Sequence, residues 1–216
     1  MKATIIVALH IEINVIISPR YMQNTHYSEG EMWETLKAVS CVIGCHGVYD
    51  DEHPARMAEM ARRIGNELAM EPQHIRAMEY AVLLHDIGQL HVRETIMRKP
   101  GRLTREEFLE VQAHPIESEK VISLMPHMSL AAHWVRWHHE WWDGSGYPDR
   151  LRGAQIPLPS RILVAVDAFA AMQCDRPYRG AMTREEALNE LRLMAGIQFD
   201  PVVVKTILKL SEKNML

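Results

Sequence analysis

Apolar residues recur every three or four positions through most of this chain, which is the period of one buried face of an α-helix. The first run comprises Met32, Leu36, Val39 and Ile43, and similar runs cover residues 57–68 and 75–82. No strand-rich block follows residue 28. The spacing therefore predicts an all-α fold, a bundle of about eight or nine helices.

Helix starts and one long break divide this pattern. Thr104 with Glu107 and Thr183 with Glu186 form candidate capping boxes, in which each threonine begins a helix. Residues 143–159 carry no helical period, and an irregular segment of that length inside a compact domain is usually functional. We expect one domain at residues 29–216. Residues 1–28 form an N-terminal extension of unknown role, in which partial alternation of apolar residues indicates a short strand.

Two short motifs bring metal-binding residue types together. Residues 138–148 read HHEWWDGSGYP, so a histidine pair and a carboxylate precede a glycine-rich turn that ends in Tyr-Pro. Residues 85–88 read HDIG, in which an imidazole and a carboxylate stand just before a glycine that can end a helix. A histidine taken alone is more often structural than a ligand. The two motifs together predict a metal site beside a loop suited to a ligand.

These motifs, with His114-Pro115 between them and DAFAAMQCDRPYR at residues 167–179, resemble the HD-GYP family of cyclic dinucleotide phosphodiesterases. The similarity runs from about residue 31 to about residue 210 and includes RKPGRLTREEF and GAQIPLPSRILVAVD. It implies an HD-type helical bundle with a GYP loop, and an HD-GYP phosphodiesterase domain at residues 29–216. It also implies seven metal ligands, which are His53, His85, Asp86, His114, His138, His139 and Asp167.

The ligand set predicts two divalent metal ions. Asp86 could bridge two ions, and the neighbouring imidazoles of His138 and His139 could each reach a different one. Five imidazoles and two carboxylates favour iron or manganese, with zinc as the alternative, over magnesium, which prefers an oxygen shell. Some family members have a further carboxylate where this chain has Tyr49, so we expect two ions rather than three.

The resemblance also implies the reaction and its residues. The implied substrate is cyclic di-GMP, whose ring a hydroxide bound to the dinuclear centre would open, with pGpG or GMP as the end product. The expected catalytic residues are His85, Asp86 and Gln89. The expected substrate contacts are Arg176 and Arg179, which match family cations near the phosphates, and Gly146, Tyr147 and Pro148 of the signature loop. Alternatively, the two arginines belong to a solvated helix end, and the loop residues form a turn with a purely structural role.

Gln89 departs from the family pattern, which usually has lysine after the HDIG motif. A neutral amide lacks the charge that would face the scissile phosphate, so turnover could be weakened. The alternative function is therefore a module that binds cyclic di-GMP or docks a partner protein. A third reading, general hydrolysis of nucleoside phosphates by the His-Asp core, also remains open.

Composition limits the partners and the location. A formal charge of -4 offers no broad positive field, so a nucleic acid polymer is not expected as a partner. Three cysteines fit a reducing cytoplasm better than a disulfide framework. The apolar run at the start of the chain is interrupted by polar residues and falls short of a membrane span. The expected partners are cyclic di-GMP and either a regulatory protein or a second copy of the chain.

Overall fold

The computed structural model describes residues 28–44, 53–175 and 180–216. Within these ranges it contains α-helices, two short 3-10 helices and no β-structure beyond one isolated bridge between Ala195 and Phe199. The all-α prediction is confirmed, since nine described α-helices have eight or more residues and α6 has four. The strand predicted for the N-terminal extension lies outside the described residues. In chain order the elements are α3 (Glu29–Gly44), α4 (His53–Glu67), α5 (Pro72–Leu84), η1 (Ile87–His91), α6 (Glu94–Met97), α7 (Arg105–Gln112), α8 (His114–Ser123), α9 (Ser129–Arg136), η2 (Gly153–Gln155), α10 (Leu158–Met172), α11 (Arg184–Leu193) and α12 (Pro201–Glu212).

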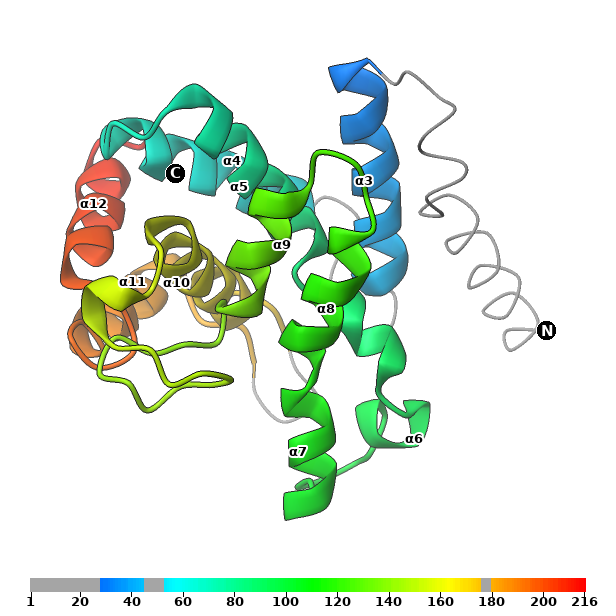
Figure 1. Cartoon of the computed structure of the whole chain (residues 1–216). Coiled ribbons are helices and arrows are strands. Elements are labelled where there is room, and N and C mark those ends of the chain that lie inside the picture. Colours follow the sequence, from blue (N-terminus) through cyan, green and yellow to red (C-terminus); the bar gives the residue numbers. More distant parts are fainter. Residues whose placement is uncertain (1–27, 45–52, 176–179) are drawn as a thin grey trace.

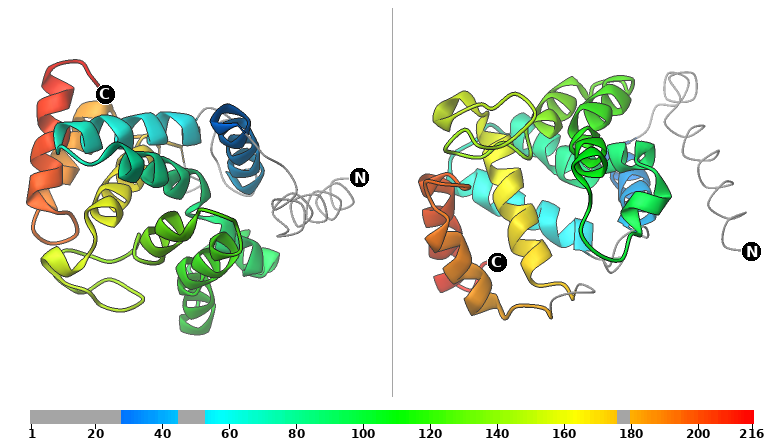
Figure 2. Two further views of the ribbon diagram at one scale, coloured as in Figure 1. Left: turned by 45° about the horizontal axis from the view of Figure 1, so that its top comes forward. Right: turned by 90° about the horizontal axis from the view of Figure 1, so that it is seen from below.

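The core lies where α4, α5, α9 and α10 pack against one another. Helix α10 is apolar on most of its circumference, which is typical of a helix buried on all sides. Ile162, Leu163, Ala165 and Val166 are accordingly 0% exposed. Helices α3 and α12 lie at opposite ends of this core (Figures 1 and 2). The core thus holds α5, α9 and α10 in fixed relative positions.

The helix starts follow the predicted capping chemistry. The hydroxyl of Thr104 accepts from the backbone N–H of Glu107, whose carboxylate accepts from the backbone N–H of Thr104. Thr183 and Glu186 repeat this reciprocal pair at the start of α11. Both capping boxes are therefore confirmed, and each supplies partners for backbone donors that a helix leaves unpaired in its first turn.

Helix α8 joins the bundle through α9 and η1, while α7 continues outward from it (Figure 1). None of the residues of α7 is buried. Three segments thereby meet beside α10: the end of α5, the start of α8 and the end of α9. In the part of the chain that the structure describes, none of the helices combines the length and apolar character needed to cross a membrane.

Candidate metal centre

Three histidines at helix ends share one local geometry. In each, the ring Nδ1 lies within hydrogen-bond distance of the backbone carbonyl three residues earlier. Because a carbonyl oxygen only accepts, Nδ1 carries a proton, and the neutral form of such a ring has its lone pair at Nε2. The three contacts are His85 with Val82 (2.8 Å), His114 with Val111 (2.7 Å) and His138 with Val135 (2.6 Å).

The Nε2 atoms of two of these rings lie close together, beside a carboxylate. Nε2 of His114 lies 3.2 Å from Nε2 of His138 and 3.3 Å from Oδ1 of Asp86. His139 joins them, with its ring centroid 4.1 Å from that of His138 and 4.9 Å from that of His114. One potential ligand atom of each of the three histidines lies within 4.8 Å of the others. A divalent cation placed between these imidazole nitrogens and the Asp86 carboxylate would be attracted to all of them at once. The residues therefore fit a metal ion.

Two carboxylates complete this group. Oδ2 of Asp86 lies 3.4 Å from Nε2 of His85, and Oδ1 of Asp167, on α10, lies 3.7 Å from the same nitrogen. Burial alone raises the pKa of Asp86, but His85 and a hydrogen bond from His114 outweigh it and hold that pKa well below its ordinary value. Asp86 is therefore an anion at neutral pH, as a ligand of divalent ions must be.

The adjacent histidines His138 and His139 are held neutral. His138 is 0% exposed, and burial with the neighbouring imidazoles lowers its pKa well below the ordinary value. Burial and His114 lower the pKa of His139 to about 3. Neutral imidazole is the form that binds metals, so these two rings need not lose a proton to do so at neutral pH.

His53, the remaining predicted ligand, begins α4 and is 7% exposed. Its Nδ1 lies 3.6 Å from Sγ of Cys174, which follows α10 two residues after its end. Close contacts thus join six of the seven predicted ligands into one group, and a contact of His53 leads to the end of the helix that carries Asp167. The role of His53 as a ligand stays a prediction.

The turn that carries Asp86 is fixed to α8 by Ser118. The Ser118 hydroxyl donates to the backbone carbonyl of His85 (2.7 Å) and accepts from the backbone N–H of Gly88 (2.8 Å). A Cβ on Gly88 would lie 2.1 Å from the carbonyl oxygen of His114, so only glycine permits this approach. The sequence alone did not predict this contact.

The GYP loop, residues 143–151, lies against the histidine pair. The backbone N–H of Tyr147 donates to the carbonyl of His139 (3.1 Å), and the two rings stack with centroids 4.9 Å apart. A Cβ on Gly146 would lie 2.3 Å from the backbone nitrogen of Trp141, which explains the glycine. The structure therefore places Gly146, Tyr147 and Pro148 beside the candidate centre, while their contact with a substrate stays a prediction.

Glu140 is a buried carboxylate that sequence reasoning missed. It is 0% exposed, and its two oxygens accept from the backbone N–H groups of Asp149 (2.6 Å) and Leu151 (3.0 Å). Burial raises the pKa of Glu140, although these hydrogen bonds oppose the rise. The carboxylate thus ties the end of the GYP loop to the histidine pair that precedes it. An acid directly after two histidines was the available signal in the sequence.

The structure places Gln89 but not all the predicted substrate contacts. Gln89 lies in η1, and its backbone N–H donates to the carbonyl of Asp86 (2.9 Å). Gln89 therefore lies next to the turn that carries Asp86. Arg176, Arg179 and Tyr49 lie outside the described residues, and the predictions made for them stay predictions.

Comparisons with known proteins identify the family to which the chain is similar. The model of the HD domain family matches residues 43–203. The chain is 38% identical over 162 residues to 3'3'-cGAMP-specific phosphodiesterase 1 of Vibrio cholerae, covering 75% of this chain and 38% of that protein. It is 33% identical over 187 residues to a cyclic di-GMP phosphodiesterase of Thermotoga maritima, covering 86% of this chain and 51% of that protein.

A solved structure confirms the fold. The crystal structure of a cyclic GMP-AMP-specific phosphodiesterase of Vibrio cholerae superposes with a TM-score of 0.66 at 20% identity, over 83% of this chain and 48% of that chain. The chain spans between 38% and 51% of the length of the two curated relatives described above. The family match covers most of the sequence, and it includes the turn at Asp86 and the GYP loop. The chain therefore belongs to the HD domain family, and its motifs place it in the HD-GYP branch of that family.

Proposed function

We propose that this protein is a metal-dependent phosphodiesterase that hydrolyses cyclic di-GMP, with pGpG or GMP as the end product. The observation that carries the proposal is the 3.2 Å approach of the His114 and His138 Nε2 atoms beside the Asp86 carboxylate. Such a cluster of imidazole nitrogens and anionic oxygens suits divalent cations, and the family relationship supplies the reaction class.

Two divalent ions, iron or manganese with zinc as the alternative, would be held by the seven predicted ligands: His53, His85, Asp86, His114, His138, His139 and Asp167. When bound, such a pair lowers the pKa of water and stabilises negative charge on a phosphodiester. No serine or cysteine nucleophile is needed for hydrolysis by this route.

Protein groups around the centre have separate tasks. Asp86 supplies a fixed negative charge, and His138 and His139 stay neutral. Burial, with Asp86 and Asp167, raises the pKa of the Tyr147 hydroxyl, so this group keeps its proton and can donate to a phosphate oxygen. Arg176 and Arg179 would bind the phosphates through their guanidinium groups.

The choice of cyclic dinucleotide needs a direct test, because relatives of this chain bear the names of two substrates, cyclic di-GMP and 3'3'-cGAMP. Initial rates should be compared for cyclic di-GMP, 3'3'-cGAMP and nucleoside phosphates under identical conditions. We expect the highest kcat/KM for cyclic di-GMP. Faster cleavage of 3'3'-cGAMP would reassign the substrate, and faster hydrolysis of nucleoside phosphates would replace the proposal with a general phosphohydrolase.

A second candidate function follows from Gln89. The amide in η1 lies next to the turn of Asp86 but has no charge to offer a developing phosphate anion. A protein that binds cyclic di-GMP with two metals present and does not cleave it would be a sensor or docking module. Calorimetric binding measured beside turnover on the same sample separates the two functions.

A cytoplasmic location and a regulatory protein or second copy of the chain as partner complete the proposal. The small number of cysteines supports the location. Size-exclusion chromatography with light scattering, with and without cyclic di-GMP, tests whether two copies associate.

A further inference from the structure

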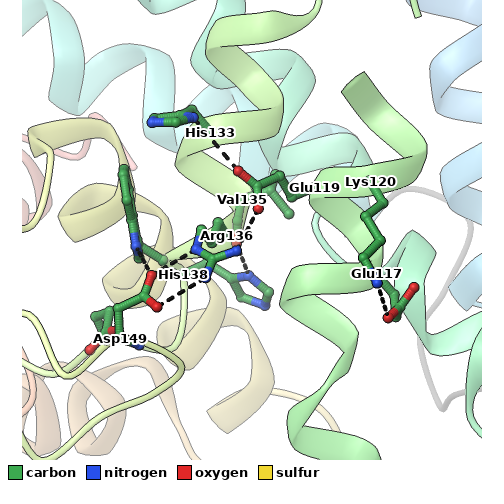
Figure 3. Close-up of polar contacts among 10 residues, drawn as sticks. Glu117, Glu119, Lys120, His133, Val135, Arg136, His138 and Asp149 are labelled. Carbon is green, nitrogen blue, oxygen red and sulfur yellow. Dashed lines mark hydrogen bonds and ion pairs between the residues drawn. The ribbon is translucent and has the colours of Figure 1, made fainter. Parts of the chain in front are cut away.

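Arg136 connects three segments of the chain through charged hydrogen bonds (Figure 3). Its Nε and Nη2 donate to the two carboxylate oxygens of Asp149 at 2.7 and 2.9 Å, and its Nη1 donates to Glu119 at 2.7 Å. The Arg136 side chain is 25% exposed, so the ion pairs are partly sheltered from water. A planar fork bound to two oxygens fixes orientation as well as distance.

Each partner belongs to a segment that builds the candidate centre. Arg136 ends α9, two residues before His138. Asp149 directly follows Pro148 in the GYP loop, and Glu119 lies on α8, which begins with His114. The charged cluster therefore joins the supports of two histidines to the end of the loop.

The end of the loop is held at both its backbone and its side chain. Glu140 accepts from the backbone N–H groups of Asp149 and Leu151. The Asp149 carboxylate accepts a third hydrogen bond, from Nε1 of Trp137 at 2.7 Å. Without Arg136 the backbone contacts to Glu140 would remain, but the bidentate contact that orients Asp149 would be lost.

We propose that Arg136 is a positioning residue that holds the GYP loop, and with it Tyr147, in place over the metal centre for the substrate. The proposal rests on the proposed phosphodiesterase function. Arg136 acts through Asp149, because its three bonded nitrogens already face protein carboxylates. Misplacing a substrate-positioning group by about 1 Å can lower a rate about 100-fold, so an indirect contact of this kind can matter for turnover.

The test uses Arg136→Met, Asp149→Ala, the double variant and Arg136→Lys. The control is the more exposed pair of Arg93, next to α6, and Glu110, on α7. The Nε of Arg93 donates to Oε2 of Glu110 at 3.0 Å, and its Nη2 lies 2.9 Å from the same oxygen. Arg93→Met and Glu110→Ala remove an arginine–carboxylate ion pair that has no contact with the GYP loop.

We expect kcat/KM for cyclic di-GMP to fall about 10- to 100-fold in Arg136→Met and in Asp149→Ala, with metal content unchanged. The double variant should lose less than the product of the two single losses, because both changes break the contact between Arg136 and Asp149. Arg136→Lys should recover little, since an ammonium cannot form the fork. The control variants should stay within about twofold of the unaltered protein.

Amide hydrogen exchange of metal-free protein gives a second readout that does not depend on turnover. The backbone N–H groups of Tyr147, Asp149 and Leu151 should exchange faster in Arg136→Met than in Arg93→Met. Unchanged exchange, rates within twofold, or a loss of metal that parallels the loss of rate would overturn the proposal. If the unaltered protein shows no turnover, the proposed function fails, while the exchange comparison still decides whether Arg136 holds the loop.

Discussion

The Nε2 atoms of His114 and His138 lie 3.2 Å apart, although the two residues are separated by 24 positions in the chain. Each ring is turned by a hydrogen bond from its Nδ1 to the carbonyl three residues earlier. The fold itself therefore directs the Nε2 atoms of both rings toward one position. The ends of the helices thus orient the rings of the candidate metal centre.

Gly88 is predicted to be essential for the approach of η1 to α8. In Gly88→Ala the new Cβ would meet the His114 carbonyl oxygen at 2.1 Å and the Ser118 nitrogen at 2.6 Å. Because backbone atoms cannot move aside easily, we expect the free energy of unfolding to fall by about 1–3 kcal/mol or more. Urea denaturation measures this change, and metal content should fall with it.

Gly30→Ala is the control for this substitution, since a Cβ there meets no atom within 4 Å and Gly30 lies inside α3. It should be neutral or slightly stabilising, by at most about 1 kcal/mol. Equal stabilities for the two variants would show that the turn of Asp86 tolerates displacement from α8.

Glu140→Gln should destabilise the GYP loop. The glutamine amide replaces one accepting oxygen with a donating NH₂ group, which would face a backbone N–H of Asp149 or Leu151. Leaving one buried donor without an acceptor costs about 1–3 kcal/mol, which urea denaturation can measure. Glu106→Gln, on the exposed face of α7, is the control. Equal effects of the two changes would contradict the role assigned to the buried carboxylate.

The metal-free protein should lose stability in mild acid through His139. Its pKa is about 3 in the fold, against about 6.5 in an unfolded chain, so between these pH values the unfolded chain binds a proton that the fold does not. The contribution of the neutral His139 ring to the free energy of unfolding is complete above about pH 6.5, and it is lost as the pH falls toward 3.

Urea denaturation of metal-free protein at about pH 7 and about pH 5 measures this loss. In His139→Gln the difference between the two pH values should shrink, because the amide takes up no proton. A difference that is the same in both proteins would show that other groups account for the acid sensitivity.

Gln89→Lys should raise the turnover of cyclic di-GMP by about 10- to 1000-fold if the missing charge limits the rate. Gln89 follows the turn of Asp86 within η1, where an ammonium could face the scissile phosphate. Steady-state kinetics at fixed metal content checks this, with Gln89→Met as the uncharged control. An unchanged kcat in Gln89→Lys would remove charge loss as an explanation for weak activity.

The sequence was sufficient to predict the helical fold and the capping boxes because both depend on local patterns. Apolar spacing along α4 and α5 and the pairs at Thr104 and Thr183 reappear as expected. The candidate metal-binding motifs could also be recognised in the sequence, since His85 with Asp86 and His138 with His139 are adjacent in the chain.

Contacts between distant segments were not predictable in this way. Ser118 bonds to Gly88 across 30 positions, and Arg136 bonds to Asp149 across 13. No periodicity marks such residues, because a serine or an arginine on a helix is ordinarily exposed, and only the packing of α8 and α9 brings their partners within reach. Glu140 escaped notice for the same reason, since the backbone N–H groups that donate to its carboxylate belong to a loop that follows it in the chain.

The most direct test of the central claim is turnover of cyclic di-GMP by metal-reconstituted protein under anaerobic conditions, with metal content measured on the same sample and His85→Ala as the control. We expect turnover with about two metal ions per chain, and loss of both metal and turnover in the control. A protein that binds no metal, or one that cleaves cyclic di-GMP equally well after His85→Ala, would contradict the proposal that these residues form the metal centre of a phosphodiesterase.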